Sequence, residues 1–370
     1  MFRQYISSIE ELIEEARNGK MFVLVDAEDR ENEGDLYIPA QMCTPQAINF
    51  MARYGRGLVC LTLTQDRADE LQIPMMTQVN RTPNKTAFTV SIEAREGIST
   101  GISAHDRAHT VSVAIDPTKG PRDIVTPGHV FPLVARPGGA LVRAGHTEAT
   151  VDISRLAGLN PAGVICEIMN DDGTMARMPD LVQFAQLHGL KIGTIADLIA
   201  YRLKYDHFVR RDGETVFKSH NGGDWKMIVY VNTLEYAEHI ALVKGDLSTP
   251  EPVLVRMHAI NVLTDMLVDA HGARDRLGES MRIIAQQGRG VVVVLRQARA
   301  TFVSDFVLQR VTDDFDRRRV RESGVGAQIL LDLGIKDMIL LTDTPEKTAV
   351  ALDGYGLNIV GTHPIRGRDS

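Results

Sequence analysis

Residues 21–35 read MFVLVDAEDRENEGD, an apolar run that passes directly into a cluster of carboxylates. The run at 21–27 is short and continuous, which predicts a buried strand. Residues 26–35 then hold six acidic side chains with only Arg30 to offset them, and Gly34 permits a tight bend. Open α/β sheets bind ligands beyond the carboxyl ends of their strands, and hard divalent ions prefer oxygen ligands. The stretch therefore predicts a strand that leads into a cation site, with a solvated charged loop as the alternative.

The neighbouring segments alternate between helix and strand. Apolar residues on one face predict a helix at 9–16, with Ser8 and Glu11 as its capping box. Thr44, followed by proline, predicts the start of a second helix. Strands are predicted at 57–64 and 88–92, helices after Ser103 and at 147–157, 180–188 and 195–205, and turns throughout the Pro/Gly-rich stretch 117–139. This alternation predicts the α/β (α+β) class.

Length and a second series of elements indicate two domains. A chain of 370 residues has room for two units of the usual size. Beyond a charged, glycine-rich segment, apolar runs that predict strands return at 227–232, 291–297 and 338–343. The sequence thus predicts an α/β domain at 1–206, a linker at 207–225 and a second α/β domain at 226–370.

Composition excludes several classes of function. With 41 Lys+Arg against 48 Asp+Glu, the net charge of −7 gives no global positive field, so no nucleic-acid partner is expected. Three scattered cysteines make no disulfide framework, which favours a reduced, cytoplasmic location. No signal peptide and no long apolar run occurs, so no membrane partner is expected either.

Two further residues are candidates for proton transfer. His129 lies between two prolines, which predicts a histidine held in a rigid turn, with an ordinary surface-loop histidine as the alternative. Glu167 ends the apolar run of GVICE, so its carboxyl is a candidate for a raised pKa and acid–base work. The alternative for Glu167 is an edge-strand acid in solvent.

Residues 143–150, RAGHTEAT, are typical of an anion site. A helical pattern begins after Gly145, so free backbone N–H groups and the positive end of the helix dipole would meet beside Arg143. A phosphate or carboxylate group would fit there. Thr147 is also an ordinary N-cap residue, and this signal alone is weak.

Together, the segments DRENEGD, RPGGALVRAGHTEAT, PAGVICE and NDDGTMAR resemble the 3,4-dihydroxy-2-butanone 4-phosphate synthase family over residues 1–206. The resemblance implies a lyase of riboflavin biosynthesis that converts D-ribulose 5-phosphate to formate and L-3,4-dihydroxy-2-butanone 4-phosphate. It also implies an α/β sandwich-like fold, a homodimer with active sites near the subunit interface, and dependence on Mg²⁺ or Mn²⁺. In that chemistry the cation stabilises an enediolate as a Lewis acid.

The resemblance assigns roles to individual residues. Glu31 and His146 match the metal ligands, and His129 and Glu167 match positions essential for catalysis. Asp35, Glu33 and Cys60 are further catalytic candidates, the last two on weaker grounds. The substrate-binding positions are Arg30, Glu31, Asp35, Arg143, Ala144, Gly145, His146, Thr147 and Glu167.

The second half resembles GTP cyclohydrolase II over residues 226–365, through LVRMH, QQGRGVVVVLRQ, GVGAQILLDLG, LLTDTPEK and GYGLNIV. That family places three zinc-binding cysteines after its R-x-H segment, and this chain has Asn261, Gly272 and Arg274 there. All three cysteines precede residue 170, and His258 with His271 would make a poor tetrahedral site. The family's RQEGRG and a later tyrosine are also altered, to RQARAT (296–301) and Ser323. We therefore expect no Zn²⁺ and no GTP ring opening.

Three other functions are weighed against a lyase with a degenerate second domain. The chain could be bifunctional, which the missing cysteines argue against. Its second half could be a guanine-nucleotide sensor, a dimerisation support or a docking surface. The whole chain could also bind a sugar phosphate without catalysis. The set Glu31, Asp35, His129, His146 and Glu167 argues against that last function, because binding alone needs fewer proton-transfer groups.

Overall fold

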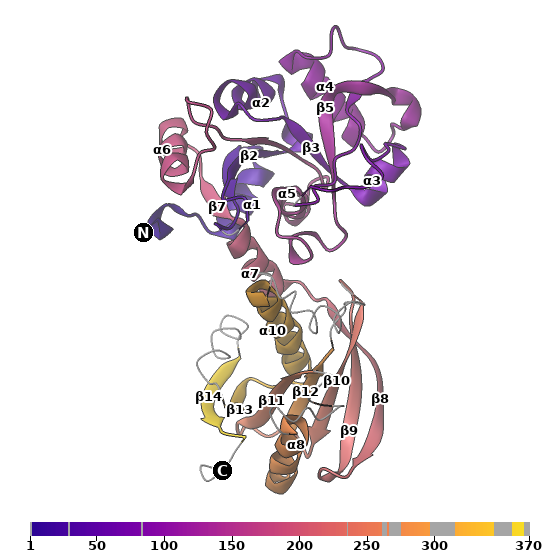
Figure 1. The fold of residues 1–370 in the computed structure, drawn as a ribbon, viewed down its shortest axis with the longest axis vertical. Coiled ribbons are helices and arrows are strands. Elements are labelled where there is room, and N and C mark those ends of the chain that lie inside the picture. Colours follow the sequence, from indigo (N-terminus) through magenta and orange to yellow (C-terminus); the bar gives the residue numbers. More distant parts are fainter. Residues whose placement is uncertain are drawn as a thin grey trace. The chain divides into compact units, whose positions relative to one another are not determined.

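The structure is a computed structural model. It describes residues 2–28, 30–82, 84–234, 236–260, 265, 275–296, 315–343 and 357–365, the backbone alone for 315–323. The chain forms two compact units that divide between Arg202 and Leu203 (Figure 1). None of the described helices combines the length and the hydrophobicity that a membrane span requires.

The first unit is built on a seven-stranded mixed sheet with the strand order β4-β5-β3-β6-β2-β1-β7. Its strands are β1 (Phe22–Val25), β2 (Gly34–Pro39), β3 (Cys60–Thr64), β4 (Ile92–Ala94), β5 (Ile124–Ala135), β6 (Gly163–Glu167) and β7 (Ile192–Thr194). Its helices are α1 (Ile9–Arg17), α2 (Pro45–Phe50), α3 (Gln65–Glu70), α4 (Ala104–Ile115), α5 (His146–Leu156), α6 (Met178–His188) and α7 (Ile195–Tyr205). Short helical segments are η1 (Arg3–Tyr5), η2 (Ala40–Met42), η3 (Met51–Gly55), η4 (Pro121–Asp123) and η5 (Gly139–Leu141).

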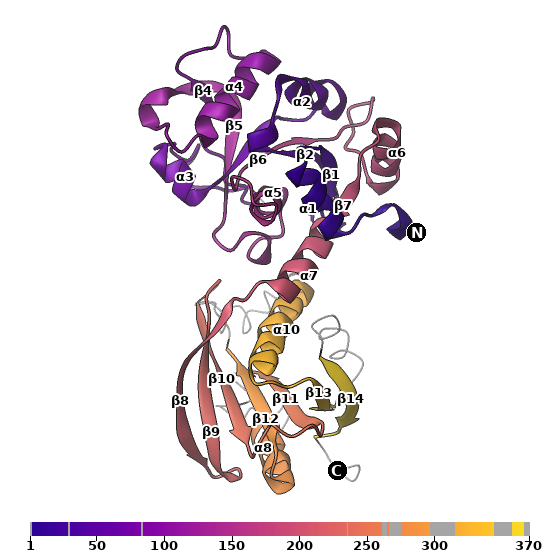
Figure 2. The same ribbon diagram turned by 180° about the vertical axis from the view of Figure 1, so that it is seen from behind.

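Helices cover both faces of this sheet (Figures 1 and 2). On β1, Phe22 and Leu24 pack with α1, α5 and α7, whereas Val23 and Val25 pack with α2, α4 and α6. This alternation is the period-two pattern of a strand buried on both faces. The face that carries α5 becomes the functional face described below.

Most sequence-predicted helices are confirmed at their caps. The Ser8 side chain accepts from Glu11 N–H and the Glu11 side chain accepts from Ser8 N–H, which completes the capping box of α1. Thr44 caps α2, and Ser103 caps α4. These caps are local hydrogen bonds, so the sequence alone is enough to indicate them.

Two predictions in the first unit are wrong. The stretch 117–139, predicted as turns, contains the twelve-residue strand β5. Its prolines and glycine mimic turn chemistry, but β5 obtains its pairing from β4 along one part and from β3 along another. The strand predicted at 88–92 lies further along, at Ile92–Ala94, and is preceded by isolated bridges.

The second unit contains another seven-stranded mixed sheet, ordered β14-β13-β11-β12-β10-β9-β8. Its strands are β8 (Val209–Ser219), β9 (Gly223–Asn232), β10 (Ala237–Lys244), β11 (Val253–Ala259), β12 (Gly290–Leu295), β13 (Asp337–Leu341) and β14 (Asn358–His363), and its helices include α8 (Arg276–Gln287) and α10 (Phe315–Asp332). Helix α8 packs on one face around the buried Trp225. On the other face, α10 approaches Met257 of β11 and Leu295 of β12 at Gly326.

The predicted linker at 207–225 is wrong. Strand β8 pairs with β9 from Val209 to Ser219, so this segment is part of the second sheet. Strand β8 is an edge strand and most of its residues are exposed. Charged residues protect an exposed edge from further strand pairing, and this gives β8 a composition like that of a linker.

Candidate active site

The acidic loop connects β1 and β2, which are neighbours in the first sheet between β7 and β6. Strands β1 and β2 are antiparallel, with Val25 opposite Gly34 and Leu24 opposite Asp35. Strand β6 pairs with the other edge of β2, where Glu167 lies opposite Asp35. Leu24, Asp35 and Glu167 thus form one row across three neighbouring strands. The fold therefore brings two carboxylates that are distant in sequence to neighbouring strands.

His146 begins helix α5 directly above this row. Its Nε2 donates to the Leu24 carbonyl at 3.0 Å, which leaves Nδ1 as the lone-pair nitrogen. Nδ1 lies 3.8 Å from a carboxylate oxygen of Asp35 and 3.9 Å from one of Glu31. Burial lowers the pKa of His146, so the ring is neutral near pH 7. A neutral imidazole with a fixed tautomer beside two carboxylates is a metal-binding arrangement.

Asp26 organises the acidic loop from within. Its Oδ1 accepts from Glu33 N–H at 2.9 Å, and its Oδ2 accepts from Arg30 at 2.7 Å and from Glu31 N–H at 3.2 Å. Asp26, Glu31 and His146 also place ligand atoms within 4.8 Å of one another. Sequence analysis placed Asp26 in the acidic cluster but gave it no role of its own.

Burial and crowding raise the proton affinity of the site's carboxylates. Burial and then the charge of Glu167 raise the pKa of Asp35 well above its usual range. Burial and Glu31 raise the pKa of Glu33, and burial raises that of Glu167. Asp35 Oδ1 is buried and accepts no hydrogen bond. A bound cation would satisfy that oxygen and offset the repulsion, so the residues present fit a divalent metal ion.

Two arginines stabilise the loop rather than project from it. Arg30 forms ion pairs with both Asp26 and Glu31. Arg177, from the NDDGTMAR segment, donates to the backbone carbonyls of Glu31 and Asn32. The predicted contact between Arg30 and substrate stays a prediction.

The predicted anion site assembles at the start of α5. Arg143 donates to Glu148 at 2.6 Å, to the Asn84 carbonyl at 3.1 Å and to Thr86 Oγ1 at 3.2 Å. No side chain caps α5, whose N-cap is Gly145. The first N–H groups of the helix thus remain available to an anion beside Arg143.

His129 lies on strand β5, so the prediction that it sits in a turn is wrong. Its Nδ1 bonds Glu93 Oε2 at 2.9 Å. Within the described part of the chain, no hydrogen bond or ion pair joins His129 to the acidic loop. Glu93 was missed in the sequence, because it lies on a different strand, 36 residues away.

Cys60 lies beside the row on β3, and its catalytic role stays a prediction. Burial, followed by the charges of Glu167 and Asp35, raises the pKa of Cys60 well above its usual range. The side chain is therefore a neutral thiol, and a thiolate is the nucleophilic form. All three cysteines are free, in agreement with the absence of a disulfide framework.

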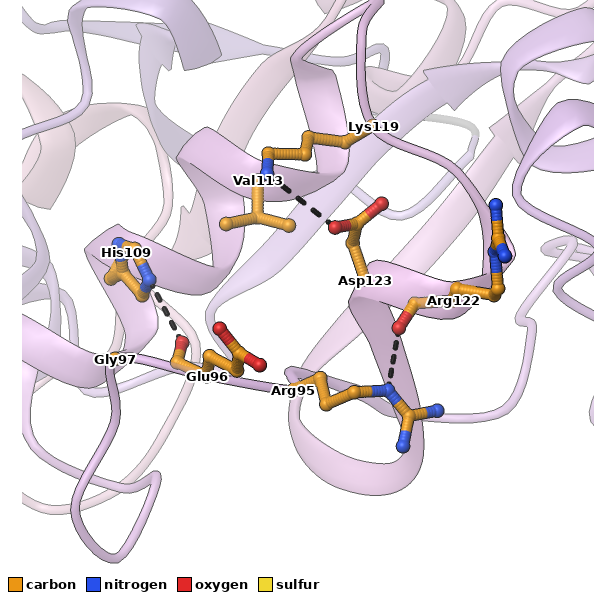
Figure 3. A pocket seen from close by; sticks show the side chains of 8 residues that line it. All are labelled: Arg95, Glu96, Gly97, His109, Val113, Lys119, Arg122 and Asp123. Carbon is orange, nitrogen blue, oxygen red and sulfur yellow. Dashed lines mark hydrogen bonds and ion pairs between the residues drawn. The ribbon is translucent and has the colours of Figure 1, made fainter.

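A separate pocket of about 400 Å³ lies between β4, α4 and η4 (Figure 3). Its charges are mixed. Lys119 pairs with Asp123 at 3.4 Å, and Arg95 Nε donates to the Arg122 carbonyl at 2.5 Å. The Glu96 carboxylate also lines it, so both basic and acidic side chains surround this pocket.

In the second unit, His258 is the one residue that the structure describes among those weighed as zinc ligands or in their places. Its Nε2 bonds Asp265 at 2.8 Å. Asn261, His271, Gly272 and Arg274 lie outside the described residues, as do 297–301 and the side chain of Ser323. The absence of a zinc site stays a prediction.

Comparison with known proteins identifies the family. Residues 10–201 match the family model of 3,4-dihydroxy-2-butanone 4-phosphate synthase. The chain belongs to this synthase family. It is therefore an enzyme, a carbon–carbon lyase. Residues 210–364 match the model of GTP cyclohydrolase II, which confirms the resemblance of the second half.

Relatives of the synthase family span the whole chain. The riboflavin biosynthesis protein RibBA of Aquifex aeolicus is 48% identical, over 97% of this chain and 92% of its own length. A protein of Pseudomonas syringae named 3,4-dihydroxy-2-butanone 4-phosphate synthase is 47% identical, over 97% of this chain and 99% of its own. Relatives that match almost all of this chain are therefore named either RibBA or 3,4-dihydroxy-2-butanone 4-phosphate synthase.

Solved structures confirm the two-domain α/β fold. RibBX of A. baumannii, a two-domain synthase, covers 97% of this chain and 99% of its own, with a TM-score of 0.77 and 41% identity. A synthase in complex with two magnesium ions covers 54% of this chain and 99% of its own, with a TM-score of 0.53 and 41% identity.

Proposed function

We propose that the first unit converts D-ribulose 5-phosphate to formate and L-3,4-dihydroxy-2-butanone 4-phosphate in riboflavin biosynthesis, with Mg²⁺ or Mn²⁺ as cofactor. One observation carries the proposal. The lone-pair nitrogen of His146 faces Glu31 and Asp35, and a buried oxygen of Asp35 accepts no hydrogen bond. The magnesium in a solved relative supports the choice of cation.

Glu31 and His146 would hold the cation. When bound, it supplies Lewis-acid stabilisation for negative charge on neighbouring substrate oxygens. Arg143 and the start of α5 bind the phosphate of the substrate. Asp26 and Arg30 keep the loop in shape, because their contacts are made within it.

The remaining groups are placed to move protons. Glu33 and Glu167 have raised pKa values and can therefore hold a proton nearer neutral pH than ordinary carboxyls. If Nδ1 of His129 donates to Glu93, its Nε2 is free to accept a proton. Removal of a proton next to the ketone and loss of formate need several such transfers.

The test is a proton NMR time course of the pure protein with D-ribulose 5-phosphate and Mg²⁺. We expect formate to appear, and excess chelator to stop it. Arg143→Gln should raise KM strongly, whereas Arg122→Gln, in the separate pocket, should not. Absence of formate with every divalent cation would contradict the proposal.

We also propose a homodimer on the strength of the family resemblance. Sedimentation equilibrium of the pure protein would report a mass near twice that of one chain. A monomer at catalytic concentrations that turns over substrate would contradict this.

The second unit supports a different candidate function, anion binding without hydrolysis. Burial, and then the charge of Arg276, lower the pKa of Arg256. The Nε atom of each arginine is buried without a hydrogen bond, and that of Arg276 lies 3.8 Å from a carboxylate oxygen of Asp343. Arg256 lies at the centre of β11, which runs parallel to β12 and β13, and its Nη1 donates to the carbonyl of Leu341, the last residue of β13, at 3.1 Å. The end of parallel strands is a common nucleotide site, so we propose that this unit binds a guanine nucleotide without opening its ring.

Trp225, the single tryptophan, lies in the core of the second unit and offers a signal for this test. We expect GTP to change its fluorescence or its unfolding temperature, and Arg256→Gln to remove the change. Zinc-dependent release of formate from GTP would show instead that the chain is bifunctional. No effect of GTP on either signal would contradict nucleotide binding.

A further inference from the structure

We propose that Glu148 is a positioning residue that sets the direction in which Arg143 presents its guanidinium to the substrate phosphate. The proposal rests on the proposed function of the first unit, in which Arg143 binds that phosphate. Glu148 itself does not touch substrate in this proposal. It acts through Arg143 and through the loop that carries it.

The position of Arg143 is fixed mainly by a buried carboxylate. Glu148 is 1% exposed, and its Oε2 accepts from Arg143 Nη1 at 2.6 Å. The other terminal nitrogen, Nη2, donates to the Asn84 carbonyl and to Thr86. An arginine has five N–H donors, so these three bonds leave donors for a ligand while the plane of the guanidinium stays fixed.

Glu148 also holds the other end of the same loop. Its Oε1 accepts from Arg136 N–H at 3.2 Å, so one side chain binds both ends of the segment 136–143. One helical turn later on α5, Asp152 accepts from Ala140 N–H at 2.7 Å, in the middle of the segment. Two carboxylates on one helix face therefore attach this loop to α5 at three points.

A buried arginine completes the attachment. Arg202 of α7 donates to Asp152 at 2.6 Å and to the Gly138 carbonyl at 2.8 Å. Because α5 begins at His146, the cation ligand and the anion-binding arginine are parts of one rigid body. The geometry thus fixes the distance between phosphate and cation before substrate arrives, which lowers the cost of orienting it.

Gly145 shows how closely this pair passes the start of the helix. A Cβ at Gly145 would lie 2.9 Å from Glu148 Oε2 and would collide with the Arg143 guanidinium. The Arg143–Glu148 ion pair therefore crosses the N-cap in space that only glycine leaves open.

The test uses the full chain with the substitution Glu148→Gln. Inorganic phosphate serves as the probe, measured as a competitive inhibitor of formate release. We expect KM and the inhibition constant for phosphate each to rise about 10-fold, because a charge-assisted bond is lost, while kcat falls less. Mn²⁺ affinity, measured by electron paramagnetic resonance, should stay unchanged, since His146 and Glu31 keep their places.

A double-mutant cycle separates positioning from general damage. If Glu148 acts through Arg143, then Glu148→Gln added to Arg143→Gln should change the phosphate constant less than about 2-fold. Additive effects of the two substitutions would overturn the proposal. The matched control is Glu14→Gln, which removes a similar Glu–Arg ion pair from the exposed surface of α1 and should leave both constants unchanged.

A second variant covers the case in which Glu148→Gln does not fold. Thr86→Val removes a weaker bond to Arg143 at 3.2 Å and should raise the phosphate constant about 3-fold. If that constant did not change in Thr86→Val, the positioning of Arg143 would be refuted. Wild-type protein that releases no formate would instead contradict the proposed function itself.

Discussion

The ring of His146 has a fixed tautomer because Nε2 donates to the carbonyl of Leu24. Burial lowers the pKa of His146, so no proton competes with a cation at Nδ1 near neutral pH. Asp35 differs, since burial and then the charges of the neighbouring carboxylates raise its pKa, and a bound cation would favour its charged form. The same site therefore combines a neutral imidazole that is ready to bind a cation with a carboxyl group whose charged form a cation would stabilise.

Replacement of His146 or Glu31 by alanine should abolish turnover by removing a cation ligand. We expect at least about 100-fold loss of formate release and at least about 10-fold weaker Mn²⁺ binding by electron paramagnetic resonance. Glu28→Gln is the control, because Glu28 is an exposed acid of the same loop. Full activity in His146→Ala or Glu31→Ala would refute the ligand assignment.

His239 predicts a pH dependence that is confined to the second unit. Burial, and then the charge of Arg296, lower the pKa of His239 to about 4. The unfolded chain takes up the proton near pH 6.5, so stability is full above that pH and falls as the pH drops toward 4. At pH 5 the unit should be about 1–2 kcal/mol less stable than at pH 7 from this residue alone.

The fluorescence of Trp225 in urea titrations would measure the effect. The control His239→Asn keeps an acceptor for the Arg296 N–H, the existing bond being 3.2 Å long, and does not titrate. The pH dependence of its unfolding should therefore be shallower than that of wild type. Equal slopes for the two proteins would show that His239 is not responsible.

Among the elements, the turn that follows η3 approaches β6 most closely at Gly57. A Cβ there would lie 2.6 Å from the Glu167 carbonyl oxygen and 2.7 Å from its nitrogen, and would also meet the carboxylate. Backbone atoms cannot move aside as a flexible side chain can, so Gly57→Ala must displace β6 or the turn. Glu167 also receives the N–H of Leu58 at 2.7 Å, and this bond would be disturbed.

We expect Gly57→Ala to cost about 1–3 kcal/mol of stability and to reduce kcat more than it raises KM, because Glu167 is proposed to move protons and Arg143 to bind. Thermal unfolding and steady-state kinetics would measure both. Gly120→Ala is the matched control, since a Cβ at Gly120 meets nothing within 4 Å. Normal kinetics in Gly57→Ala would contradict a role for the position of Glu167.

The helices and strands also show which parts of the structure can be predicted from the sequence and which cannot. Helices α1, α2 and α4 are indicated by caps formed within four residues, and the acidic loop by one continuous stretch. Strand β5 cannot be predicted from its own residues, because its prolines are typical of turns. Its strand structure depends on pairing with β3 and β4. The Glu93–His129 bond and the Asn84 and Thr86 contacts of Arg143 join distant segments, so no local pattern contains them.

At the scale of the whole molecule, the two units have separate sheets and separate cores. A solved relative with two magnesium ions corresponds to 54% of this chain and is covered over 99% of its own length. That protein therefore has the fold of the first unit and lacks a second domain. In this chain the first unit needs helix α7, because Arg202 of α7 donates hydrogen bonds to Asp152 and to the Gly138 carbonyl.

A chain cut after Tyr205 keeps all of α7 and should fold and release formate at a rate within about 3-fold of the full chain, because its core is complete. A chain cut after Thr194 is the matched control. It loses Arg202 and leaves Asp152 as a buried charge without its partner, which typically costs about 3–5 kcal/mol, so it should unfold or aggregate. Thermal unfolding, sedimentation and the formate assay would be compared for both. Loss of activity or of the oligomeric state in the longer fragment would mean that the second unit supports the first structurally, whereas unchanged values would exclude that support and leave nucleotide binding and docking of another protein as its candidate functions.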